Sequence, residues 1–100
     1  METARSPLSR HASTGGSTSI VNDEYGKIQN AGTIHHDGAI ENYGTINNDG
    51  TIYNESTINN DGTINNSGDG KIYNEYTINN DGTINNDGAI YNEYTINNDG

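Results

Sequence analysis

Isoleucine occupies every sixth position along most of this chain, and polar residues fill nearly all the positions between. The isoleucines run in steps of six from Ile28 to Ile64, and again from Ile72 to Ile96. Two extra residues separate the two runs. A period of six fits neither an α-helix, with about 3.6 residues per turn, nor a heptad coiled coil. The pattern therefore indicates a repeat that is not helical.

Each six-residue unit, typically Gly-Thr-Ile-Asn-Asn-Asp, predicts one short β-strand followed by one corner. The β-branched pair favours a strand, and Asn, Asp and Gly favour a turn. A strand this short is not stable alone, but stacked copies form a solenoid that buries a column of isoleucine. A helix would have to absorb a glycine in almost every second turn, at about 1 kcal/mol each. The predicted fold is all-β, and its predicted core isoleucines are Ile40, Ile46, Ile52, Ile58, Ile64, Ile72, Ile78 and Ile84.

A longer repeat predicts the number of strands in each coil. The variant unit Ile-Tyr-Asn-Glu begins at Ile52, Ile72 and Ile90, and another unusual unit begins at Ile34. The spacing is 18 residues, or 20 where the two extra residues enter. Three hexapeptides therefore make one coil, which predicts a parallel, triangular β-solenoid of about four coils. Equivalent residues should stack: His35, Tyr53, Tyr73 and Tyr91 in one column, and Asn42, Asn60, Asn80 and Asn98 along one corner.

The composition divides the chain into two parts. Residues 1–19 contain both arginines, the single proline and many Ser, Thr and Gly residues, which is typical of a flexible polar tail. We expect this tail to project from the core. Residues 20–100 form the repeat domain, with regular strands from about Ile28 and one irregular unit at Ile20. The inserted pair Asp69-Gly70 predicts a bulging corner loop.

Composition also excludes several kinds of site and partner. The chain has no cysteine, so it has neither disulfides nor thiolate metal sites. A formal net charge of −10 argues against nucleic acid and anionic membranes, because both are bound by clustered Lys and Arg. No apolar run is long enough for a membrane span or a standard signal peptide. No nucleophile, base and orienting residue form a recognisable set, so an enzyme is not expected.

Residues 26–100 resemble the hexapeptide repeats of triangular β-helices. They resemble more closely the Gly-Thr-Ile-Asn-Asn repeats of large bacterial adhesins and filamentous haemagglutinin-like surface proteins. The aliphatic residue at every sixth position matches, and Gly44 and Gly50 match the small residue two positions earlier, whereas Tyr76 and Tyr94 depart from it. The resemblance implies a fibrous or cell-surface setting, which favours an extracellular location, and it carries over no catalytic residue. Hexapeptide acyltransferases share the period, but the chain lacks the histidine-bearing inserted loops that such enzymes need.

Carboxylates should also stack from coil to coil. From Ile28 onward the chain has eleven acidic residues and one lysine. Like charges one coil apart, at about 4.8 Å, repel by about 0.9 kcal/mol even in water. The columns form either an acidic surface that keeps solenoids from clumping or sites where calcium or another divalent cation bridges coils, and in both cases high salt or low pH should favour stacking. The candidate columns are Asp37, Glu55, Glu75 and Glu93, and Asp61, Asp81 and Asp99.

The adjacent pair His35-His36 is a weaker candidate for a metal site. Neighbouring strand residues point to opposite faces, and no cysteine or further histidine lies nearby in the sequence. We interpret the pair as a corner variation.

Two functional interpretations remain. Solenoids that stay monomeric cap their ends, whereas here the repeat continues to Gly100 without a closing helix, and open parallel edges are templates for another chain. The first interpretation is therefore a structural protein that forms a homopolymer. The second is a surface adhesin or glycan-binding module whose tyrosine column stacks on sugar rings. A less favoured third is an ice-binding solenoid, with Thr57, Thr77 and Thr95 in one row beside Asn59, Asn79 and Asn97.

The filament hypothesis predicts its own interface. Twelve hexapeptides from Ile28 to Ile96 make four whole turns, with Ile96 on the second side of its turn and Ile28 on the third. A following copy would therefore dock with its residues 25–33 and continue the stack. Head-to-tail contact of this kind does not close into a ring. The predicted interface residues are Tyr25, Ile28, Ile34, Ile90 and Ile96.

Overall fold

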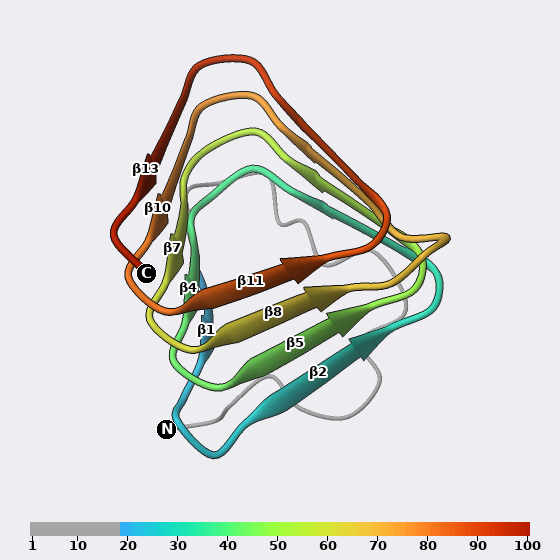
Figure 1. Cartoon of the computed structure of the whole chain (residues 1–100), viewed down its shortest axis with the longest axis horizontal. Coiled ribbons are helices and arrows are strands. Elements are labelled where there is room, and N and C mark those ends of the chain that lie inside the picture. The colour runs from blue at the N-terminus through green and yellow to red at the C-terminus, as the bar shows by residue number, and fades with distance from the viewer. Residues whose placement is uncertain (1–18) are drawn as a thin grey trace.

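The computed structural model of the chain describes residues 19–100, and every regular element in this part is a β-strand. Thirteen short strands wind into triangular coils, stacked from the blue N-terminal coil to the red C-terminal coil in Figure 1. None of the described residues belongs to a helix that could cross a membrane. The expected tail lies outside the described residues, apart from Ser19.

Three parallel sheets form the three sides of the coil, and each strand pairs with the strands one turn away. Sheet 1 has five strands: β1 (Ile20–Asn22), β4 (Ile40–Asn42), β7 (Ile58–Asn60), β10 (Thr77–Asn80) and β13 (Thr95–Asn98). Sheet 2 has four strands: β2 (Lys27–Asn30), β5 (Thr45–Asn48), β8 (Thr63–Asn66) and β11 (Thr83–Asn86). Sheet 3 has four strands: β3 (Thr33–His36), β6 (Thr51–Asn54), β9 (Lys71–Asn74) and β12 (Ala89–Asn92).

The strand register confirms the predicted coil length. Ile40 pairs with Ile58, 18 residues later, and Ile52 pairs with Ile72, 20 residues later, where the two extra residues enter. The triangular all-β solenoid is therefore confirmed. The predicted aromatic column is confirmed as well: His35 pairs with Tyr53, and Tyr73 lies between Tyr53 and Tyr91.

Isoleucines from all three sheets meet in one core. The isoleucines from Ile28 to Ile78 are at most 3% exposed. Ile84 and Ile90 are partly buried and pack against this core, whereas Ile96 in β13 is 52% exposed. The isoleucines of the last three strands are therefore the least buried.

The second asparagine of most units also lies in the core. We expected one set of these asparagines to line a corner. They are instead the last residues of the strands of sheet 1, and Asn42 is 0% exposed. Asn42 Nδ2 donates to Asn60 Oδ1 at 2.6 Å, to Gly44 O at 3.1 Å and to Thr63 O at 3.1 Å. Because one amide satisfies acceptors of its own corner and of the next coil, a polar side chain fits inside. Similar ladders run through sheet 2 (Asn30, Asn48, Asn66, Asn86) and sheet 3 (Asn54, Asn74, Asn92).

Two of the three corners require glycine because successive coils approach closely there. At the corner after sheet 1, a Cβ on Gly62 would collide with the carbonyl oxygen of Gly44, one coil below. At the corner after sheet 2, a Cβ on Gly88 would collide with Gly70 O. The corner after sheet 3 carries Tyr76 and Tyr94, whose exposed rings stack with centroids 5.3 Å apart. The departure from the small-residue pattern is therefore confined to one corner.

The two extra residues belong to a projecting turn, as expected for a bulging corner. The Gly70 N–H donates to Ser67 O at 2.8 Å, and a Cβ on Gly68 would have no neighbour within 4 Å. A similar turn joins β1 to β2, where the Gly26 N–H donates to Asp23 O at 2.9 Å.

Candidate functional site

The sheet edges of the last coil are open among the described residues. β11, β12 and β13 each pair only with the strand one coil below. Ile96 is 52% exposed, whereas Ile78, which lies below it in the same sheet, is 2% exposed. With Ile84 and Ile90, these isoleucines line an apolar recess. The predicted interface residues Ile90 and Ile96 thus lie together on one accessible surface.

The first coil also ends in unpaired strand edges, because among the described residues β1, β2 and β3 each pair only with the strand one coil above. Ile28 and Ile34 are 1% and 2% exposed, although their strands are the first in sheets 2 and 3. Ile20, in β1 of the same coil, belongs to the same buried cluster. Tyr25, in the turn between β1 and β2, is 88% exposed. Of the three interface residues predicted at this end, only Tyr25 is accessible.

β1 also changes the count of turns. The count from Ile28 gives twelve units, whereas residues 19–100 form thirteen strands, and both β1 and β13 lie in sheet 1. If a following copy placed its β2 over β11, its β1 would occupy the position of β13. The docking expected from the sequence therefore has no room while β1 stays in place.

The asparagine ladders have a direction. In sheet 1 each amide nitrogen donates to the carbonyl oxygen of the next coil, from Asn22 to Asn42 and finally from Asn80 to Asn98. At the start of this ladder, Asn22 Oδ1 is buried without a hydrogen-bond partner among the described residues. At its end, the side chain of Asn98 is exposed. The ladder thus has an unused acceptor at one end and an accessible amide donor at the other.

Acidic side chains stack at two corners, in the predicted columns. Backbone hydrogen bonds from Glu55 to His36 and from Glu75 to Asn54 place these acidic residues one above another. At the remaining corner, Ser67 lies above Asp49 and donates a hydrogen bond to its carboxylate, so that this column is interrupted. Cation binding by the columns stays a prediction. The exposed members are Asp37, Glu55, Glu75 and Glu93 at one corner, and Asp61, Asp81 and Asp99 at the other.

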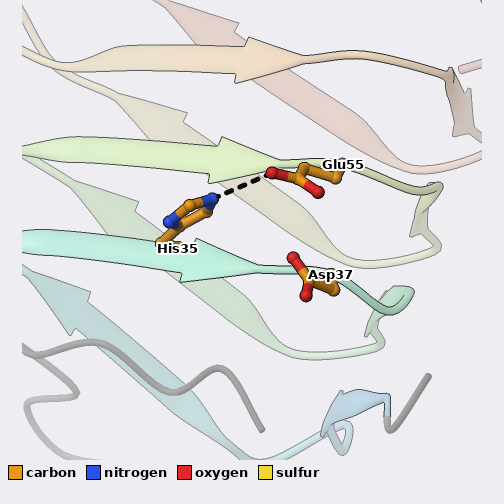
Figure 2. Close-up of side chains that lie close together, drawn as sticks. All are labelled: His35, Asp37 and Glu55. Carbon is orange, nitrogen blue, oxygen red and sulfur yellow. Dashed lines mark hydrogen bonds and ion pairs between the residues drawn. The ribbon is translucent and has the colours of Figure 1, made fainter. Parts of the chain in front are cut away.

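His35, Asp37 and Glu55 lie close together at the start of the first column, as Figure 2 shows. His35 Nε2 is 3.1 Å from Glu55 Oε2, and one ligand atom from each residue lies within 4.8 Å of the others. All three are exposed, whereas His36 is buried on the opposite face. An imidazole and two carboxylates are ligands that zinc and similar ions accept. The sequence interpretation missed this grouping because Glu55 comes from the next coil.

The outward-facing asparagines and tyrosines form regular columns, and within each column the side chains contact one another. Asn79 and Asn97 each donate an amide hydrogen bond to the asparagine one coil below, at 2.9 and 2.8 Å. The rings of Tyr73 and Tyr91 stack at 4.8 Å with an interplanar angle of 11°, and Tyr53 stacks on Tyr73 in the same way. Most tyrosine faces in this column are therefore covered by other tyrosines.

The chain matches no protein-family model, no curated protein and no solved structure. Its resemblance to adhesin repeats is thus supported at the level of the β-solenoid fold alone.

Proposed function

We propose that the chain is a structural protein that self-assembles head to tail into β-solenoid filaments. The observation that carries this proposal is the open apolar edge of the last coil, where Ile96 is 52% exposed in a column that is otherwise buried. Unpaired parallel strands with exposed isoleucine are templates for another chain. A second copy supplies the complementary surface because every coil carries the same isoleucine and asparagine columns.

The energetics favour association at this edge. Burying one isoleucine side chain contributes about 1.5–3 kcal/mol, and Ile84, Ile90 and Ile96 would all become more buried. The exposed amide of Asn98 would also find an acceptor in the next coil. The two surfaces in contact are different, so the assembly extends as a fibre and does not close.

Cations would modulate assembly through the acidic columns. Glu93 is the last carboxylate of its column and Asp37 the first, so continuing the stack would bring these two like charges together. Calcium or another divalent cation would offset their repulsion, and the cluster of His35, Asp37 and Glu55 supplies ligand atoms close to this point.

A glycan-binding surface module is the alternative, and the column of Tyr53, Tyr73 and Tyr91 is the observation in its favour. Stacking on a sugar requires an accessible ring face, and in this column the faces largely cover one another. Ice binding would use the row of Thr and Asn on sheet 1, where the outer asparagines bond to each other. Both alternatives treat the chain as a soluble monomer, which distinguishes them from a filament.

Sedimentation of the purified 100-residue chain, over a range of concentrations with and without calcium, tests the proposal. We expect a pelletable species above a threshold concentration, with unbranched filaments in negative-stain electron microscopy. A monomer at every concentration, also in calcium, would contradict the filament proposal and favour the glycan-binding alternative.

A further inference from the structure

Residues 20–26 and residues 95–100 are two versions of one structural unit. Each places a strand in sheet 1, β1 at one edge and β13 at the other. Asn22 and Asn98 belong to the same side-chain ladder. Gly26 and Gly100 belong to the same column of corner glycines, in which Gly26 O lies against Gly44 and Gly82 O against Gly100. Either unit therefore has the shape that fits beneath β4.

The β1 unit is the less complete version. β1 has three residues and β13 has four. Within residues 19–100, Asn22 Oδ1 is buried without a hydrogen-bond partner, which destabilises the strand that carries it. In contrast, Asn98 Oδ1 accepts a hydrogen bond from Asn80 Nδ2 at 2.7 Å.

Replacing β1 by the β13 of another copy removes both the unpaired acceptor of Asn22 in β1 and the exposure of Ile96 in β13. Asn98 in the place of Asn22 would donate to Asn42 Oδ1, as Asn22 does at 2.8 Å, while its own oxygen stays bonded to Asn80. Ile96 would enter the core in place of Ile20. The buried unused acceptor and the exposed isoleucine would therefore disappear in the same step.

The same replacement creates the room that head-to-tail docking needs. Once β1 has left, β2 of one copy lies over β11 of the preceding copy, and β3 lies over β12. Ile28 and Ile34 then contact Ile84 and Ile90, which are partly exposed at the open edge. With β1 retained, only sheet 1 would be continuous, and one strand would be missing from each of sheets 2 and 3 at the joint.

Building on the proposed filament, we propose that β13 of one copy replaces β1 of the next, so that β1 only temporarily occupies the place beside β4 that β13 takes in the filament. The partner is a second copy of this chain, and its contact residues are those of β13 and its corner glycine. A chain whose β1 cannot leave would remain a monomer, because β1 and the incoming β13 need the same place beside β4.

A disulfide that ties β1 to β4 tests this proposal. Val21 and Glu41 are paired across the two strands, and the chain has no cysteine of its own. Paired strands lie about 4.8 Å apart, within the Cα separation of about 4.4–6.8 Å that a disulfide spans. The test variant is V21C/E41C. The control is N59C/N79C, which ties β7 to β10 at outward positions of the same sheet and leaves both edges unaltered.

Assembly of each variant is followed by light scattering, oxidised and after reduction. We expect oxidised V21C/E41C to assemble at least tenfold more slowly than the wild type and to recover on reduction, while N59C/N79C assembles at the wild-type rate in both states. Assembly of oxidised V21C/E41C at the control rate would overturn the replacement of β1 and leave the filament proposal standing. If neither the wild type nor any variant assembles, the filament proposal fails, and the inference fails with it.

Discussion

Asn60 Nδ2 donates to Asn80 Oδ1 at 2.7 Å and so joins two coils through the interior of the solenoid. The same nitrogen lies 3.1 Å from the carbonyl oxygens of Gly62 and Thr83. Asn60 is 0% exposed, so water cannot replace the amide at these acceptors. The interior ladders thus add to the backbone hydrogen bonds that hold the coils together in the walls.

Replacing Asn60 by leucine tests the interior ladder. Asn60→Leu keeps the approximate size of the side chain but leaves buried acceptors without a donor, at about 1–3 kcal/mol for each. We expect the free energy of unfolding in urea to fall by at least about 2 kcal/mol. Asn59→Leu, on the outer face of the same strand, is the control and should change stability by less than about 1 kcal/mol. Equal effects of the two substitutions would show that the buried amide has no special role.

The corner glycines give a second prediction about stability. A Cβ on Gly62 would collide with Gly44 O, whereas a Cβ on Gly68 would meet open space. Gly62→Ala should therefore destabilise the solenoid by about 1–3 kcal/mol, the usual cost of overpacking. Gly68→Ala should leave the urea midpoint nearly unchanged. A neutral Gly62→Ala would mean that the coils are not stacked as closely as described.

The acidic residues at the joint predict a salt-dependent rate of assembly. Stacking Asp37 of one copy over Glu93 of another would cost about 0.9 kcal/mol at 4.8 Å in water. Asp37→Asn should therefore assemble about fourfold faster at low salt. The difference should disappear in about 1 M NaCl, where the screening length is about 3 Å. Asp69→Asn, in the projecting turn, is the charge-matched control, and an equal acceleration by this variant would indicate a general charge effect.

The direction of the backbone N–H at Ile96 predicts a variant that folds but does not polymerise. The N–H groups of Ile20 and Ile40, its equivalents in sheet 1, donate to Ala39 O and Thr57 O of the next coil, each at 2.9 Å. The Ile96 N–H therefore points toward the next copy, and a proline there removes a donor that only the joint uses. Ile96→Pro should unfold in urea almost like the wild type but form no filaments, and Ile96→Val should still assemble. Filaments of Ile96→Pro would contradict this position of the joint.

The sequence was sufficient to predict the solenoid because it carries two repeats, a short one that marks each strand and a longer one that marks each coil. Isoleucine at every sixth position indicates the strands, and the recurrence of Ile-Tyr-Asn-Glu at Ile52, Ile72 and Ile90 indicates three strands in each coil. The buried asparagine also has a signal in the sequence. Since side chains alternate across a strand, the residue two positions after each isoleucine must face inward with it.

Other features could not be read from the repeat. β1 departs from the six-residue spacing, because Ile20 lies eight residues before Ile28, and it falls in the same sheet as β13 only when this irregular unit is counted as a full side of the first coil. The grouping of His35 with Glu55 depends on which residues of successive coils meet. Such contacts follow from the register of the whole stack and not from any single unit.

The axial rise per subunit, measured by cryo-electron microscopy of wild-type filaments, tests the central claim most directly. Replacement of β1 joins copies after four whole coils, so we expect a rise of about 19 Å per subunit along a continuous stack with a spacing of about 4.8 Å. A rise of about 24 Å would mean that β1 is retained and that each copy occupies five coils. A purified chain that forms no filaments at all would contradict the account of this solenoid as a self-assembling subunit.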